Sequence, residues 1–272
     1  MRVLRPKSFA ARLLAVVALV AAVSASNARG AQQRPRRTED PEKAKALVER
    51  AIAALGGATF LGVTSEVGVG TFTAFEQGRR GIPSPFVDTF VYPDKNRTEF
   101  GKKKTRVVQS NAGASGWKYD ASREALEDQG ESETAAFQRF VRAHAGNVLR
   151  RFWREPGVKL HYLGREEIGP REWAEGVAVE YPDGFEVELL FDADGLPVIS
   201  RYREGAESGA AGSLVATKYF MYIDHGGVKA PRIVDLYRDQ VQTARIVYDT
   251  VTFNASVAPS AFDRPENAKS LK

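Results

Sequence analysis

The chain contains no cysteine, and this absence excludes several kinds of protein at once. No disulfide can hold the fold, no thiol can act as a nucleophile, and no lipid can be attached through a cysteine. Histidine is also rare: His144, His161 and His225 lie far apart and lack metal-ligand spacing. Phosphate-loop, dinucleotide-binding and serine-hydrolase motifs are missing too, so we expect no metal, no cofactor and no enzymatic activity.

Long apolar runs are scarce, and the clearest one lies near the start of the chain. Residues 13–23 (LLAVVALVAAV) follow a basic start and precede candidate cleavage sites at Ala25, Ala28 and Ala31. A run this short, followed by small residues, is typical of a secretory signal peptide rather than a membrane-spanning helix. We therefore predict a signal peptide over residues 1–31 and a periplasmic or secreted protein that is soluble after cleavage.

The basic excess of the chain is concentrated in this predicted signal peptide. The whole chain has 39 Lys and Arg against 34 Asp and Glu, and the first 28 residues hold four of the basic residues and none of the acidic ones. The remainder is nearly neutral, so we expect no nucleic-acid partner. One basic run remains at residues 95–106 (KNRTEFGKKKTR), which is typical either of a solvated hairpin or of a site for an anionic partner.

The sequence is rich in short alternating strands separated by glycine turns. In residues 185–192 (FEVELLFD), apolar and acidic side chains largely alternate, which predicts one buried and one solvated face. Turns at Asp183-Gly184, Asp194-Gly195 and Gly226-Gly227 fall at the spacing of consecutive hairpins. Residues 158–253 therefore predict an antiparallel sheet, and we expect further strands between residues 61 and 119.

Two segments break the strand pattern with helical spacing. Residues 40–55 carry an apolar stripe, with Asp40 to cap the helix and Gly56-Gly57 to end it. Residues 134–153 repeat apolar side chains at helical spacing, and Gly146 and Asn147 predict a kinked helix or two short ones. We predict a disordered leader over residues 32–39, a domain over residues 40–265 and a tail over residues 266–272.

Four stretches give this arrangement a resemblance to a known family. They are residues 53–63 (AALGGATFLGV), 115–120 (SGWKYD), 181–197 (ending in FDADGLP) and 251–265 (VTFNASVAPSAFDRP). On these stretches the chain resembles the periplasmic lipoprotein-carrier superfamily, the LolA/LolB-like proteins. The resemblance implies a mainly β fold with helices (α+β): an unclosed antiparallel half-barrel of about 11 strands, with helices plugging its concave face.

The resemblance also implies a hydrophobic ligand, the acyl chain of a lipid or lipoprotein, held between sheet and helices. We expect the sheet to supply a hydrophobic wall and the second helical segment to supply a plug. The predicted wall residues are Phe90, Trp117, Val187, Leu189, Phe191 and Met221, and the predicted plug residues are Phe137, Phe140 and Val141. Plug and ligand would compete for the wall, because an acyl chain is attracted by about 0.8 kcal/mol per buried CH₂ group.

The sequence leaves three alternatives to a carrier or chaperone open. The same fold can serve as an envelope sensor or protein-interaction module without a transported ligand. Sheet and helix can also be packed shut as an ordinary core, or the chain can be an exported enzyme. Lipid that copurifies with the protein favours the carrier, whereas a stable complex with an envelope protein and no lipid favours the sensor.

Overall fold

The structure is a computed structural model that describes residues 40–205 and 212–271. The predicted signal peptide and leader, residues 1–39, lie outside the described residues. The described residues fall into two compact units. The first unit contains residues 64–140 and 246–271, and the second contains residues 40–63 and 141–245.

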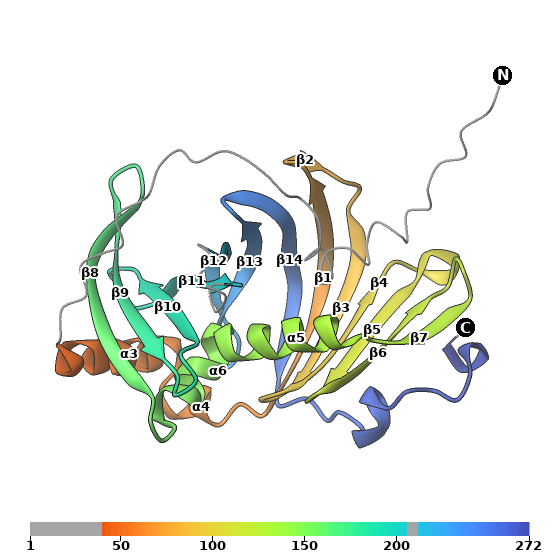
Figure 1. The fold of residues 1–272 in the computed structure, drawn as a ribbon, viewed down its shortest axis with the longest axis horizontal. Coiled ribbons are helices and arrows are strands. Elements are labelled where there is room, and N and C mark those ends of the chain that lie inside the picture. Colours follow the sequence, from red (N-terminus) through yellow and green to blue (C-terminus); the bar gives the residue numbers. More distant parts are fainter. Residues whose placement is uncertain (1–39, 206–211, 272) are drawn as a thin grey trace. The chain divides into compact units, whose positions relative to one another are not determined.

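Fourteen strands, more than the roughly 11 expected from the sequence, make up one antiparallel sheet. The strand order is β7-β6-β5-β4-β3-β1-β14-β13-β12-β11-β10-β9-β8, with the short β2 paired to β1 alone. Because β7 and β8 stand at opposite ends of this order, the sheet is unclosed (Figure 1). The prediction of a mainly β, α+β fold with an unclosed antiparallel sheet is confirmed.

The first unit contains the strands from the N-terminal half of the sheet. Its elements are β1 (Ser65–Glu76), β2 (Arg79–Arg80), β3 (Ser84–Val91), β4 (Lys95–Phe100), η1 (Lys103–Thr105), β5 (Val107–Ala112), β6 (Ser115–Asp120), β7 (Ala125–Asp128), most of α5 (Glu131–Ala143), the second half of β14 (Val241–Phe253), η4 (Pro259–Phe262) and η5 (Ala268–Leu271). Gly70 lets β14 approach β1 closely, since a Cβ atom there would lie 2.0 Å from the carbonyl oxygen of Val247.

The C-terminal segment packs on one face of this unit. The carbonyl oxygen of Phe262 accepts hydrogen bonds from Ser110 and from the indole of Trp117, at 3.1 and 2.8 Å. Leu271, within the predicted tail, is buried in a cluster with Val108, Trp117 and Tyr119. Residues 259–271 therefore cover the sheet face to which Trp117 belongs.

The second unit contains the hairpins that the glycine turns predict. Its elements are α3 (Pro41–Leu55), α4 (Ala58–Leu61), α6 (Ala145–Arg150), η2 (Phe152–Arg154), β8 (Lys159–Gly169), β9 (Glu172–Glu180), β10 (Glu186–Phe191), β11 (Pro197–Glu204), β12 (Ser213–Asp224), β13 (Lys229–Arg238) and the first half of β14. Each of the three predicted turns joins two consecutive antiparallel strands.

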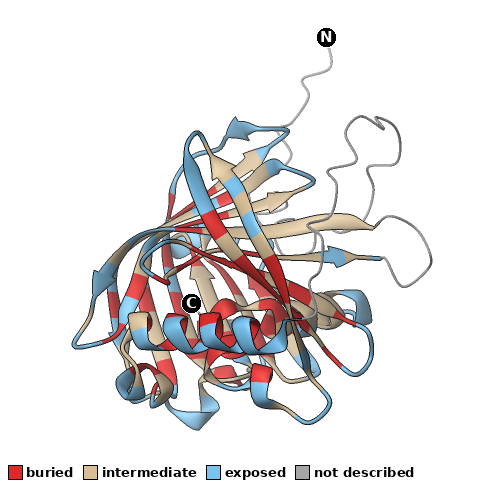
Figure 2. Cartoon of the chain, turned by 90° about the vertical axis from the view of Figure 1, so that its left-hand side faces the viewer, coloured by how far each residue is buried: buried red, intermediate tan, exposed pale blue. Residues whose placement is uncertain are grey.

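Helix α3 has the caps that the sequence predicts. The Asp40 carboxylate accepts a hydrogen bond from the backbone N–H of Lys43 at 2.9 Å, and Gly56 ends the helix with φ of 126°. Its apolar side, which includes Leu47, Val48 and Ile52, is buried against β8, β9 and β13, and its polar side is exposed (Figure 2). None of the helices in residues 40–205 and 212–271 is long and apolar enough to cross a membrane.

The second predicted helical segment consists of two separate helices, α5 and α6. The sequence predicted either this form or a single kinked helix. The break falls at His144, whose backbone is extended (φ −64°, ψ 117°), two residues before the Gly146 that suggested it. The His144 ring caps α6 by accepting a hydrogen bond from the N–H of Asn147 in the first turn of that helix. Burial, helped by the charge of Arg150, lowers the pKa of His144 to about 3 and keeps the ring a neutral acceptor.

Candidate functional site

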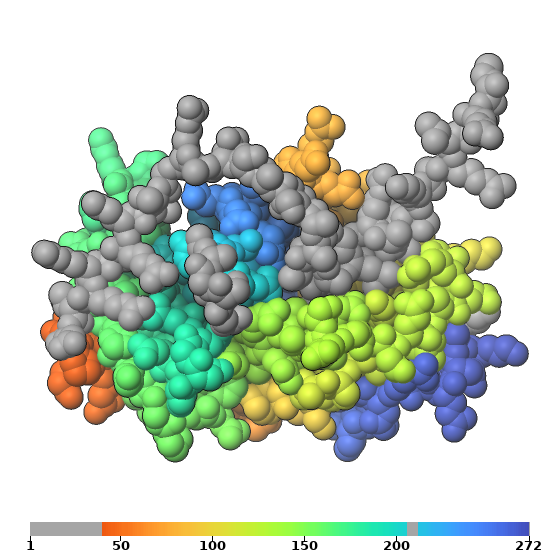
Figure 3. Space-filling model, viewed as in Figure 1, coloured from red at the N-terminus to blue at the C-terminus, as the bar shows by residue number. Residues whose placement is uncertain are grey.

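In the first unit, the N-terminal part of α5 covers one face of the sheet. The ring centroid of Phe140 lies 6.2 Å from that of Phe90 on β3 and 6.4 Å from that of Phe137. Lys118 of β6 donates hydrogen bonds to both carboxylate oxygens of Glu133, at 3.0 and 3.2 Å, and so fastens the start of α5. Phe90 and Phe137 are buried, whereas Phe140 is only partly buried. Residues of the segment that contains α5 lie at the surface in the space-filling view (Figure 3).

The strand register separates two residues that the sequence analysis assigned to one wall. Phe90 pairs with Asn96, which pairs with Asn111 on β5. Trp117 pairs instead with Ser110, the neighbour of Asn111. Directly paired residues share a face and adjacent residues alternate, so Phe90 and Trp117 lie on opposite faces. Trp117 packs under the C-terminal segment, and its inclusion with Phe90 in one wall was wrong.

In the second unit, β10 has the buried face that its alternation predicts. Val187, Leu189 and Phe191 are each 0% exposed, and Val141 at the C-terminal end of α5 is 6% exposed. The opposite face of β10 is less polar than expected, because Leu190 is buried in a small cluster with Ala174 and Ile199. The role of the predicted residues as a ligand wall stays a prediction.

Met221 differs from the other predicted wall residues, because its side chain is 58% exposed. Its φ angle is 56°, in a region that interrupts the regular alternation of side chains along β12. The sequence analysis placed Met221 in the wall by strand alternation, and this backbone irregularity is why Met221 lies at the surface instead. Met221 is therefore not part of the buried wall.

A buried polar group, which sequence reasoning missed, lies on the face that α5 covers. Asp88 is 7% exposed, and its carboxylate accepts hydrogen bonds from the Asn96 amide and the Thr98 hydroxyl, both at 2.7 Å. Tyr248 of β14 hydrogen-bonds the same carboxylate. We call these four residues the Asp88 cluster. Burial raises the pKa of Asp88 from 3.8 to about 7, against the effect of these hydrogen bonds.

A second carboxylate lies on the same face as the Asp88 cluster. Glu66 of β1 is paired directly with Phe90 and accepts a hydrogen bond of 2.6 Å from the hydroxyl of Tyr92. The sequence did contain a signal for the buried Asp88. Asp88 lies two residues from both Phe86 and Phe90, so all three side chains point to the same face of β3. An acidic side chain that alternates in step with aromatic ones must be either solvated or hydrogen-bonded in the core.

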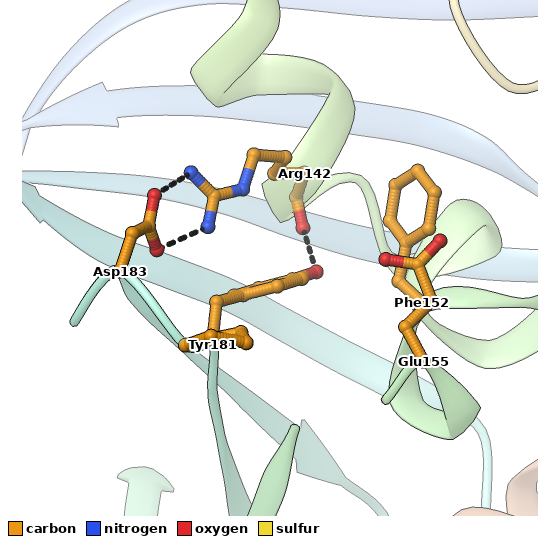
Figure 4. A pocket seen from close by; sticks show the side chains of 6 residues that line it. Arg142, Phe152, Glu155, Tyr181 and Asp183 are labelled. Carbon is orange, nitrogen blue, oxygen red and sulfur yellow. Dashed lines mark hydrogen bonds and ion pairs between the residues drawn. The ribbon is translucent and has the colours of Figure 1, made fainter. Parts of the chain in front are cut away.

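A pocket of about 320 Å³ lies in the second unit and is lined by Arg142, Phe152, Glu155, Tyr181, Pro182 and Asp183 (Figure 4). The guanidinium of Arg142 donates two hydrogen bonds of 2.7 Å to Asp183. The hydroxyl of Tyr181 donates to the carbonyl oxygen of Arg142 at 2.8 Å. Three of the six lining residues carry charged side chains, and two of these, Arg142 and Asp183, are paired with each other.

The contacts of Arg142 fasten the C-terminal end of α5 to the turn between β9 and β10. The guanidinium lies 4.3 Å from the ring centroid of Tyr181 and 4.5 Å from that of Phe185. The hydrogen bonds from Arg142 lower the pKa of Asp183 from 3.8 to about 2, so this ion pair persists at every ordinary pH.

The structure shows no cluster of metal-binding side chains among residues 40–205 and 212–271. His144 caps α6, and the Nε2 of His161 lies 3.0 Å from the carboxylate of Glu180. The side chains of both histidines thus contact other groups of the fold.

No family model matches the chain, and no curated protein matches its sequence. Solved structures, however, match most of its length. A putative outer membrane lipoprotein-sorting protein domain from Vibrio parahaemolyticus matches with a TM-score of 0.52 and 11% identity, over 82% of this chain and 97% of that one. A LolA superfamily protein from Nitrosomonas europaea matches with a TM-score of 0.52 and 10% identity, over 80% and 96%.

A DUF1329 family protein from Desulfovibrio piger is similar to the same extent, with a TM-score of 0.55 and 11% identity over 82% of this chain and 98% of that one. Identities this low concern the fold and leave the ligand open. The strand order, the helix on the sheet face and these three matches agree with the resemblance found in the sequence, and the chain has the LolA-like fold.

Proposed function

We propose that this chain is an exported, non-catalytic carrier or chaperone of the cell envelope that holds the acyl chain of a lipid or lipoprotein. The proposed site lies in the first unit, on the sheet face that α5 covers, with Phe90 as the wall and Phe137 and Phe140 as the plug. Two of the structural neighbours are named for lipoprotein sorting or the LolA superfamily, which supports a ligand of this class.

The observation that carries the proposal is the partly buried contact of Phe140 with Phe90. A closed core would bury both rings completely, whereas here one ring of the pair remains accessible at the edge of the helix. An ion pair of Glu133 with Lys118 helps to hold the helix start to the same face. The two side chains are 21% and 17% exposed, so a ligand that replaces the plug must offset this partly buried ion pair by burying its own apolar surface.

The energetics favour replacement of the plug by an acyl chain of ordinary length. Each buried CH₂ contributes about 0.8 kcal/mol, so about four methylene groups match the burial of one large aromatic side chain, roughly 3 kcal/mol. Ligand and plug therefore compete for the ring of Phe90, and a weaker plug should leave a tighter ligand site.

This competition gives a directional test with a fluorescent fatty acid as the probe. Phe140→Ala removes the plug contact with Phe90, and we expect the purified protein to bind the probe about fivefold more tightly, for a loss of about 1 kcal/mol of plug burial. Gln138→Ala is the matched control, because Gln138 is exposed on the same helix and the substitution also places an alanine there.

Wild-type protein that binds no probe, or a Phe140→Ala variant that binds it no better than Gln138→Ala, would contradict the carrier proposal. Native mass spectrometry of protein from the cell envelope adds a second criterion. A bound lipid is the expected result, whereas a stable complex with an envelope protein and no lipid would favour the sensor alternative. The intact mass of the same sample tests the predicted cleavage between Ala25 and Ala31.

A further inference from the structure

Two exposed segments, a hairpin tip and a loop, lie at the same end of neighbouring strands in the first unit. We call this end of the strands the edge. The hairpin tip, residues 76–83, contains β2 and turns at Gln77 and Gly78, both of which have positive φ. The loop, residues 101–106, begins where the N–H of Gly101 donates to the carbonyl oxygen of Pro85 at 2.9 Å. Since Pro85 stands two residues after the hairpin tip, both segments emerge at the same edge. In the space-filling view the hairpin tip protrudes at the top, in orange (Figure 3).

This edge carries a strong positive charge. Its exposed cationic residues are Arg79, Arg80, Lys102, Lys103 and Lys104. Within the part of the chain that the structure describes, none of these five side chains has a hydrogen-bond or ion-pair partner. The two segments contain one acidic residue, Glu76, so the field at this edge is positive although the chain without its first 28 residues is nearly neutral.

An exposed aliphatic side chain stands among these charges. Ile82 stands two residues after the end of β2 and is 72% exposed, the largest exposure of any large apolar side chain in the described residues. Gly81 before it still donates a hydrogen bond of 2.8 Å to the carbonyl oxygen of Ala74 on β1, whereas Pro83 after it has no N–H to donate. An exposed aliphatic side chain close to cations in the chain matches the chemistry of the boundary between lipid headgroups and acyl chains.

From this combination we infer that the edge formed by residues 76–83 and 101–106 docks on the surface of an anionic phospholipid bilayer. The five cations meet the phosphate groups of the headgroups, and Ile82 enters the boundary region beneath them. This surface differs from the proposed acyl site: Phe90 lies towards the far end of β3, which starts at Ser84 beside the hairpin tip.

Vesicle binding of the full chain tests the inference, with phosphatidylcholine vesicles that contain or lack phosphatidylglycerol. We expect sedimentation with the anionic vesicles only, and weaker binding as the salt concentration rises. The double substitution Arg79→Gln with Arg80→Gln should lower the partition coefficient roughly 30-fold, since each cation near the surface contributes about fivefold. Lys102→Gln with Lys104→Gln should act in the same way and provides an independent variant.

The matched control is Lys229→Gln with Arg232→Gln, which removes two exposed cations of the second unit and should leave binding unchanged. All variants share residues 1–39, so a contribution of that segment to vesicle binding is the same in each of them. Circular dichroism confirms that the variants are folded, and fatty-acid probe binding reports on the acyl site separately.

Ile82→Ser separates a bilayer from a soluble polyanion as the partner. We expect it to weaken binding to anionic vesicles several-fold without changing the net charge. Loss of binding with the cation variants but not with Ile82→Ser would overturn the inference in favour of a soluble anionic partner. Equal binding of the cation variants, the control and the wild type would overturn it altogether.

Discussion

Asp88 provides the sharpest test of the packing under α5, because the structure buries an acidic group between aromatic ones. Asp88 lies on the same strand face as Phe86 and Phe90, and Asn96 and Thr98 of the neighbouring strand β4 hydrogen-bond to it. Asparagine has nearly the same shape and keeps a carbonyl oxygen that accepts both hydrogen bonds. Asp88→Asn therefore removes the titratable charge while preserving the hydrogen bonds from Asn96 and Thr98.

The expected magnitude follows from the difference between two pKa values. The pKa of Asp88 is about 7 in the folded chain, against an ordinary value of 3.8. Between these values the folded state holds a proton that the unfolded state has lost, so stability falls as the pH rises through this window and is constant above it. At about 1.4 kcal/mol per unit, the deficit above pH 7 amounts to roughly 4 kcal/mol, an order-of-magnitude figure for a buried group.

We therefore expect Asp88→Asn to be more stable than the wild type by one to several kcal/mol at pH 8, and the difference to vanish near pH 4. Urea denaturation at a series of pH values, followed by tryptophan fluorescence, measures this difference directly. Asp249→Asn is the control, because Asp249 is exposed on β14 and loses the same charge. A difference that is absent at pH 8, or that grows as the pH falls, would refute the reasoning about burial.

Three other substitutions test the packing elsewhere. Leu189→Ala should cost about 2–5 kcal/mol in urea denaturation, because the side chain is 0% exposed, and a cost below about 1 kcal/mol would show that the site readily collapses. Gly70→Ala should destabilise by several kcal/mol or give insoluble protein, since its Cβ would meet the Val247 carbonyl oxygen at 2.0 Å, and normal thermal stability would contradict that close approach. Arg142→Ala should cost only about 1 kcal/mol or less, because its partner Asp183 is 60% exposed, and a much larger loss would mean that the ring contacts dominate.

The parts of the fold that the sequence predicts well are those set by local spacing. Residues 40–55 combine a cap, an apolar stripe and a glycine stop, and α3 begins and ends within a residue of these signals. The turns at Gly184, Gly195 and Gly226-Gly227 all have positive φ, which is the conformation that glycine permits, and hairpins form at each. The buried face of β10 follows from its alternation in the same local manner.

The position of Trp117 depends on contacts that no local pattern records. Within SGWKYD, Trp117 and Tyr119 are expected to face a core, and they do face one. That core is made by Phe262 and Leu271, about 145 residues further along the chain, so alternation alone cannot tell which side of the sheet it occupies. A weakly periodic strand can be oriented only once its register with its neighbours is known.

Helix α5 is also predicted from spacing within its own sequence, whereas the contacts that hold it involve residues far away in the sequence. Its apolar stripe is local, and Phe137, Phe140 and Val141 do share a side of the helix, as the spacing predicts. What holds the helix is distant: Glu133 bonds to Lys118, Arg142 bonds to Asp183, and the Ser200 hydroxyl donates to the carbonyl oxygen of Ala143. The stripe therefore identifies which residues can form a plug, whereas these polar contacts at its two ends determine how firmly the plug is held, and the two ion pairs weaken as salt concentration rises.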